Sequence, residues 1–112
     1  MSYYKKMNSF YAIFKSIEEI GISFDELLII SFLSSQWNLN NDVDSKKMTQ
    51  NFSRYSKSTM HRKLNLLRNK NVIDYQVDYE DGRKILIIKG KCYLRVTDEL
   101  EHIIENFQPF SL

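Results

Sequence analysis

Five polar side chains between positions 57 and 65 have the spacing of one helical face. They follow one another at intervals of one, three, one and three residues: Lys57, Ser58, His61, Arg62 and Asn65. Guanidinium and ammonium groups can donate to guanine O6 and N7, and a carboxamide matches the N6/N7 edge of adenine. Hydroxyl and imidazole groups suit either base edges or phosphate. We therefore interpret these five residues as candidates for contacting bases in the major groove of a duplex.

A second set of polar residues lies at predicted helix starts or at the end of the same face. Exposed N–H groups and the helix dipole favour phosphate at a helix start, and such contacts position a protein without reading sequence. The candidates for phosphate contact are Lys46, Lys47, Arg54, Tyr55, Ser56 and Arg68.

The charges of the chain are segregated along the sequence. Residues 44–95 hold thirteen Lys or Arg and five acids, a net charge of +8, whereas the rest of the chain holds three Lys and nine acids, a net charge of −6. The total of +2 therefore hides a basic middle between acidic ends. A field of one sign over part of a small protein indicates a polyanionic partner, and double-stranded DNA is the one we predict.

The first elements that must support this basic middle are two helices. Apolar residues spaced by three or four predict a helix over about 3–20, which Gly21 ends. Ser23 and Glu26 have the form of a capping box, and the apolar residues that follow, up to Trp37, predict a buried second helix.

A helix-turn-helix is predicted over about 44–70. Asp44 or Ser45 can cap a short helix that runs through Phe52, and Ser56 can cap the next helix, which runs to about Lys70. Met60, Leu64 and Leu67 then face inward, opposite the polar face described above.

The periodicity changes to two after Asn71, which predicts a β-hairpin, or wing, over about 72–89. Its strands, 72–79 and 84–88, flank an Asp-Gly turn, and the candidate contacts of this wing are Asp81, Arg83 and Lys84. A helical period returns over about 91–107. The fold class we predict is α+β, mostly α: a single winged helix-turn-helix domain over 1–112 with dimerisation helices at both ends.

The stretch from Ser56 to Leu64 resembles the recognition-helix pattern of MarR-type winged-helix regulators, with Met60 and Arg62 at the family's valine and arginine positions. Asp81-Gly82-Arg83 resembles the family's Asp-x-Arg at the wing tip, and the layout from Ile22 onward is closest to the short SarA-like branch. The resemblance implies that Arg83 enters the minor groove and that Asp81 orients it. It also implies a homodimer formed by the first and last helices, with the interface residues Met7, Phe10, Phe14, Val96, Leu100, Ile103 and Phe107.

Other kinds of function find little support in the sequence. We expect no enzyme, no cofactor and no metal site, because no phosphate-binding loop, metal-ligand spacing or nucleophile motif is present. Without an apolar run long enough for a membrane span, a secretory signal or a second cysteine, the chain is expected to be cytoplasmic. A small-molecule effector is conceivable but unsupported. Cys92, beside Lys91 and Arg95, is either a redox sensor or, more commonly for such a residue, a small apolar side chain.

The sequence thus predicts a homodimeric, sequence-specific, double-stranded-DNA-binding transcription regulator. Its recognition helix would lie in the major groove and its wing at the minor groove. Two alternatives stay open: a plasmid or phage replication or partition adaptor, and a winged-helix module whose basic face binds an acidic protein.

Overall fold

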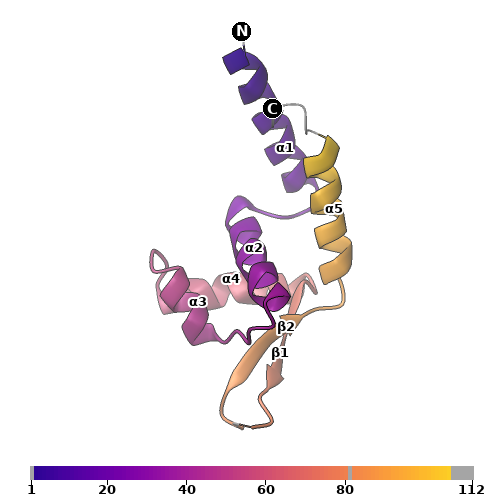
Figure 1. Cartoon of the computed structure of the whole chain (residues 1–112). Coiled ribbons are helices and arrows are strands. Elements are labelled where there is room, and N and C mark those ends of the chain that lie inside the picture. The colour runs from indigo at the N-terminus through magenta and orange to yellow at the C-terminus, as the bar shows by residue number, and fades with distance from the viewer. Residues whose placement is uncertain (1, 81, 107–112) are drawn as a thin grey trace.

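A computed structural model of the chain describes residues 2–80 and 82–106, with side chains from Asn8 onward. The elements follow one another as α1 (Ser2–Glu19), α2 (Phe24–Asn38), α3 (Ser45–Asn51), α4 (Lys57–Asn69), β1 (Ile73–Val77), β2 (Ile85–Lys89) and α5 (Tyr93–Asn106) (Figure 1). Asp81, Phe107 and the side chain of Met7, which the sequence predicts at the wing and the dimer interface, lie outside the described part. The predicted fold class, mostly helical with a two-stranded wing, is confirmed.

The core is organised around α2, the predicted buried helix. Ile29, Ile30 and Leu33 are buried on it, and the aromatic residues Phe32 and Trp37 pack against the same core. The capping box is formed as predicted, since the Glu26 N–H donates to Ser23 Oγ at 3.1 Å and the Ser23 N–H to Glu26 Oε1 at 2.9 Å. This cap fixes where α2 begins, directly after the α1–α2 turn at Gly21, whose φ is +84°.

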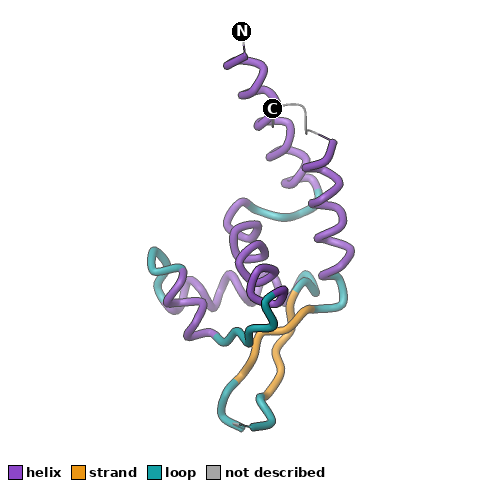
Figure 2. The backbone as a smooth tube through the Cα atoms, in the orientation of Figure 1, coloured by secondary structure: helices purple, strands orange, loops and turns teal. Residues whose placement is uncertain are grey.

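Helices α3 and α4 form the helix-turn-helix, and both begin at the capping residues that the sequence suggests. Asp44 accepts from the Lys47 N–H at 2.8 Å, and Ser56 accepts from the Thr59 N–H at 3.2 Å. The turn between them, residues 52–56, is short (Figure 2). The ring of Phe52 in this turn packs edge-to-face against Phe32 of α2, with ring centroids 5.6 Å apart.

Strands β1 and β2 pair antiparallel, from Ile73 opposite Lys89 to Val77 opposite Ile85. The hairpin is anchored at its base by a segment before α3. The Ile87 N–H donates to the Val43 carbonyl at 2.8 Å, and the Trp37 indole donates to the Ile87 carbonyl at 3.3 Å. Asp44 adds an isolated bridge to Leu86. The wing is therefore tied to α2 and to the start of the helix-turn-helix.

Helix α1 extends away from the rest of the molecule, and α5 flanks its C-terminal half (Figure 1). The molecule is therefore elongated, with extents of 57 × 27 × 25 Å along its principal axes. Ile13 and Ile17 of α1 and Val96 and Leu100 of α5 belong to one buried cluster. None of the helices in the described residues is both long and apolar enough to cross a bilayer.

Candidate nucleic-acid interface

The five predicted base-contacting residues, Lys57, Ser58, His61, Arg62 and Asn65, are all exposed on α4. The inward face holds Met60, Leu64 and Leu67, each buried almost completely. These three apolar side chains fix the rotation of α4 about its axis, so the polar face points to solvent along its length. The structure thus places the five residues together on one surface, where a duplex could reach them.

Asn65 and Arg68 are also connected to the wing. The Tyr75 hydroxyl donates to Asn65 Oδ1 at a long 3.4 Å, the Arg68 guanidinium lies 4.8 Å from the centre of the Tyr75 ring, and Arg68 Nε lies 3.3 Å from Asp74 Oδ1. Burial raises the pKa of Tyr75 above 10.0, although Arg68 opposes this effect. Because Arg68 forms an ion pair with Asp74, part of its positive charge is neutralised within the protein.

The predicted phosphate contacts differ in how available they are. Lys46 and Arg54 are exposed, and the guanidinium of Arg54 lies 5.8 Å from the centre of the Tyr55 ring. Lys47 is half-buried, with its ammonium group 3.5 Å from the Asp42 carbonyl. The Tyr55 hydroxyl donates to Asp25 Oδ1 at 2.8 Å, so its single proton is engaged within the protein. Ser56 uses its hydroxyl as the cap of α4.

Two basic residues, Lys63 of α4 and Lys70 at its C-terminal cap, are bound to carboxylates of α2. Lys63 donates to Asp25 Oδ2 at 2.8 Å and is only 14% exposed, and Lys70 donates to Glu26 at 2.7 and 2.8 Å. Both lysines belong to the basic field of the sequence, and neither was predicted to contact DNA. Their spacing of seven residues places them on one side of α4, but it does not identify the partners.

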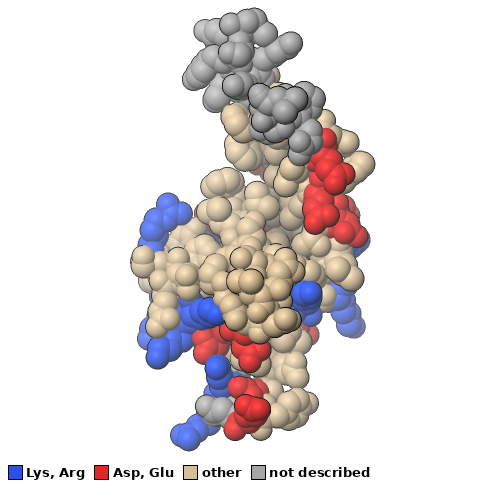
Figure 3. Space-filling view, in the orientation of Figure 1, with Lys and Arg blue, Asp and Glu red and all other residues tan. Residues whose placement is uncertain are grey.

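The wing contributes little positive charge. Residues 72–89 hold three Lys or Arg and four acids, a net charge of −1, whereas residues 44–71 have a net charge of +7. Lys84 lies 4.0 Å from Asp44, and Arg83 is exposed near the tip. Figure 3 shows basic side chains around the helix-turn-helix, both basic and acidic side chains on the wing, and an acidic patch over α5. The basic field of the sequence is thus mainly a property of the helix-turn-helix.

The predicted dimer residues fall into two groups. Phe10 and Phe14 are exposed on α1, and Ile103 is half-buried on α5. Val96 and Leu100 are buried within the single chain, with 6% and 5% exposed. Tyr11, which is not among the predicted interface residues, is 66% exposed on the same helix as Phe10 and Phe14.

Cys92 is half-buried at the turn before α5, where its N–H donates to the Asn71 carbonyl at 2.7 Å. Among the described side chains, no group of three or more His, Cys, Asp or Glu is arranged to hold a metal ion.

Several solved structures superimpose on nearly the whole of this chain, and their names include MarR and MepR. A MepR variant from S. aureus bound to an oligodeoxyribonucleotide superimposes with a TM-score of 0.79 at 14% identity, covering 92% of this chain and 72% of that one. A MarR variant from E. coli complexed with operator DNA superimposes with a TM-score of 0.70 at 9% identity, covering 94% of this chain and 73% of that one. The transcription regulator MarR from Oenococcus oeni PSU-1 superimposes with a TM-score of 0.68 at 19% identity, covering 93% of this chain and 75% of that one.

No protein-family model matches the sequence, and no curated protein does. The likeness to MarR-type regulators is therefore a likeness of fold, and it extends over nearly the whole chain. The chain has the winged helix-turn-helix fold of the MarR-type regulators.

Proposed function

We propose that this protein is a sequence-specific, double-stranded-DNA-binding transcription regulator. The observation that supports the proposal most directly is the surface of α4. Its outer face presents hydrogen-bonding and cationic groups that suit base edges, and its inner face is fixed by buried Met60, Leu64 and Leu67. A helix of this kind fits the major groove, which is about 12 Å wide.

The contacts to DNA would divide by type. Arg62, Lys57, Ser58, His61 and Asn65 would meet base edges, and Lys46, Arg54 and the exposed N–H groups at the start of α4 would meet phosphates. Arg83 at the tip of the wing would meet the minor groove or its phosphates. Because the wing has a net charge of −1, most of the electrostatic attraction would come from the helix-turn-helix.

A homodimer is part of the proposal. Helix α1 extends from the body and exposes Phe10, Tyr11 and Phe14, a run of aromatic surface that a second copy would cover. A two-fold dimer would present two copies of α4 about 34 Å apart, one helical turn of DNA, and would prefer pseudo-palindromic sites.

Substitution of one base-contacting and one phosphate-contacting candidate tests the proposal. Arg62→Ala should cost about 1 to 3 kcal/mol of binding free energy and relax base preference, because it removes a bidentate donor. Lys46→Ala should weaken binding to all sequences alike and lower the salt slope by about one unit, because it removes one phosphate contact. The measurement is selection of duplexes from a random library, followed by titration at several salt concentrations.

If Arg62→Ala leaves both affinity and preference unchanged, α4 does not read the sequence in the proposed way. The symmetry of the selected site reports the dimer, and repetition of that site over a long array would favour a replication or partition role instead of promoter occupancy.

A second candidate function is a protein-interaction module, and it is favoured by the apolar surface of the wing. Val77 and Ile85 form an exposed cross-strand pair, and Tyr79 beyond them is 91% exposed. A gel shift with random duplex DNA at low salt separates the two functions, because an interaction module would not retard the duplex at micromolar protein.

A further inference from the structure

The start of α2 holds two neighbouring carboxylates, and each binds a different lysine, one within α4 and one at its C-terminal cap. Asp25 Oδ2 accepts from Lys63 Nζ at 2.8 Å, and Glu26 accepts from Lys70 Nζ at 2.7 and 2.8 Å. The side chain of Glu26 is only 6% exposed. These two ion pairs, Asp25–Lys63 and Glu26–Lys70, are called the α2–α4 clamp below.

The geometry of the clamp constrains the direction of α4 as well as its position. Lys63 and Lys70 are seven residues apart, so they lie on one side of the helix and are separated by about 10 Å along its axis. The buried apolar residues Met60, Leu64 and Leu67 pack one face of α4 against the core. Two polar contacts at this separation add constraints on the direction of the helix axis.

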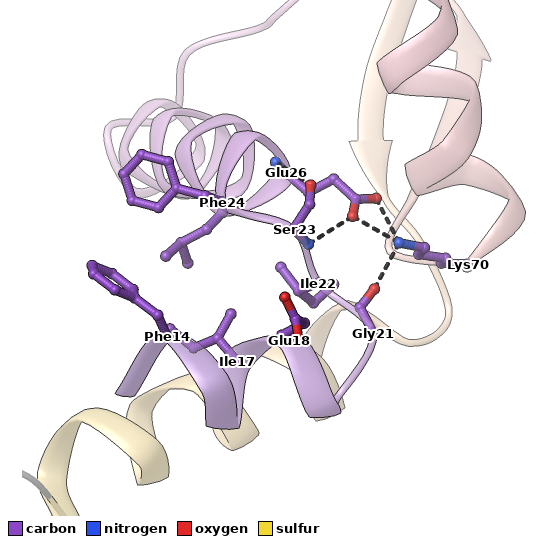
Figure 4. Close-up of a pocket in the computed structure, with 10 residues that line it drawn as sticks. Phe14, Ile17, Glu18, Gly21, Ile22, Ser23, Phe24, Glu26 and Lys70 are labelled. Carbon is purple, nitrogen blue, oxygen red and sulfur yellow. Dashed lines mark hydrogen bonds and ion pairs between the residues drawn. The ribbon is translucent and has the colours of Figure 1, made fainter. Parts of the chain in front are cut away.

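Each end of the clamp is joined to a further element. The Asp25 end includes Tyr55 of the turn before α4, whose hydroxyl donates to Asp25 at 2.8 Å and whose ring lies 5.1 Å from Lys63 Nζ. The Glu26 end includes the α1–α2 turn, because Lys70 Nζ also donates to the Gly21 carbonyl at 2.6 Å (Figure 4). The clamp therefore sets α4 relative to the turn, to α2 and to the end of α1.

We propose that Asp25 and Glu26 are positioning residues for sequence recognition: through Lys63 and Lys70 they hold α4 at the angle at which its outer face meets base edges. This inference rests on the proposed function, since it assigns a role to residues that do not touch DNA. Base contacts depend on the orientation of the helix more strongly than phosphate contacts do, because hydrogen bonds to base edges need defined directions. Loosening the clamp should therefore reduce specific binding more than non-specific binding.

Asp25→Asn tests the proposal because charge and positioning predict opposite results. The substitution removes one negative charge from a protein that binds a polyanion, so electrostatics alone predicts tighter binding to every duplex. Loss of the ion pair to Lys63 predicts weaker binding to the preferred site. The structure is expected to tolerate the change, because Asp25 is 42% exposed and an asparagine can still accept the Tyr55 hydrogen bond.

The experiment measures dissociation constants for two duplexes: the site that the wild type selects from a random library, and an unselected sequence of equal length. We expect Asp25→Asn to lower the ratio of specific to non-specific affinity by about tenfold, in line with coupling between side chains of one network. Affinity for the unselected duplex should stay equal or rise. Asp98→Asn is the matched control, because it makes the same change at an exposed position of α5 and should leave the ratio unchanged.

A second pair of variants separates positioning from a general loss of structure. Lys63→Arg keeps the charge that faces Asp25, so the ratio of specific to non-specific affinity should stay close to that of the wild type. Lys63→Gln should lower this ratio about as much as Asp25→Asn does. The double variant Lys63→Gln/Asp25→Asn should have nearly the same affinity ratio as either single variant, because both substitutions break the same ion pair.

The possible outcomes keep the two proposals apart. If the wild type selects no site, the proposed function is wrong and the positioning role is wrong with it. If the wild type selects a site and Asp25→Asn keeps the ratio within twofold, the proposed function stands and the clamp is not a positioning device.

Discussion

Two hydrogen bonds and two nearby cationic groups stabilise the negative charge of Asp25. Its pKa is lowered from 3.8, first by the hydrogen bond from Lys63 and then by that from Tyr55, with smaller contributions from the charges of Lys63 and Arg54, while burial acts in the opposite direction. A carboxylate held this way is bonded more favourably in the folded chain than in the unfolded chain. Its contribution to stability must therefore depend on pH.

The sign of this dependence gives a prediction. Because the pKa of folded Asp25 is below its unfolded value, the stabilisation is fully present above about pH 4 and is lost as pH falls through the folded pKa. Asp25→Asn should be less stable than the wild type at neutral pH, and the difference should narrow below pH 3.8. Urea unfolding of both proteins at a series of pH values measures this; Asp98→Asn, whose carboxylate is exposed, is the control. A difference in the free energy of unfolding that is the same at every pH would show that the charge of Asp25 is not what stabilises the fold.

The sequence could predict which face of α4 points outward but not where each charge on it is used. The apolar residues Met60, Leu64 and Leu67 have helical periodicity, and the structure confirms that face. The ion pairs of Lys63 and Lys70 could not be deduced in the same way, because they depend on carboxylates of α2 that are 38 and 44 residues away in the chain. Long lysine side chains can also reach partners well off their own face.

At the scale of elements, the wing is the part in which local signals were strongest. The Asp-Gly turn and the alternating apolar residues predict the hairpin, and the observed strands lie within one or two residues of the predicted ones. The anchoring of the hairpin through Val43, Asp44 and Trp37 was not predicted, since a single bridge and an indole hydrogen bond have no local sequence pattern. Helix α5 begins at Tyr93, not Lys91, because the Cys92 N–H is bonded to Asn71.

The junction between the wing and α5 allows a test with a matched glycine pair. A Cβ at Gly90 would collide with the Asn71 carbonyl oxygen and lie 2.9 Å from the Ile73 nitrogen, whereas a Cβ at Gly82 would meet nothing within 4 Å. Gly90→Ala should therefore lower the free energy of unfolding by about 1 to 3 kcal/mol, because backbone must move to admit the methyl group.

Urea denaturation monitored by circular dichroism measures this, with Gly82→Ala as the control that should stay within about 0.5 kcal/mol of the wild type. Equal stability of the two variants would mean that the close approach of Gly90 to Asn71 is relaxed in solution.

At the scale of the whole molecule, the shape of the chain is asymmetric. The helix-turn-helix, the wing and α2 form a body, and α1 extends from it with α5 along part of its length (Figure 2). Phe10 and Phe14 stack on α1 with ring centroids 6.4 Å apart, and Phe14 meets Phe24 edge-on at 5.7 Å, yet both residues of α1 stay exposed. The predicted interface residues Val96 and Leu100 are already buried in one chain, so the aromatic residues of α1 are a large part of the apolar surface left for a second copy.

Phe14→Ser tests this view of assembly. It removes an exposed aromatic side chain from the surface that a second copy would cover, and we expect the dissociation constant of the dimer to rise about tenfold or more. Leu39→Ser is the control, because Leu39 is 67% exposed at the end of α2 and lies outside the proposed interface. Sedimentation equilibrium over a range of concentrations measures both. A wild type that stays monomeric throughout, or an unaltered association of Phe14→Ser, would contradict the proposed interface.

The acidic character of the wing has a kinetic consequence for a DNA-binding protein. A regulator finds its site among a vast excess of other sequences, and the time it spends on each is set by electrostatic attraction alone. A wing of net charge −1 beside a helix-turn-helix of net charge +7 weakens that attraction without altering base contacts. On the proposed function, the acidic residues of the wing would shorten the time that the protein spends at each unrelated sequence.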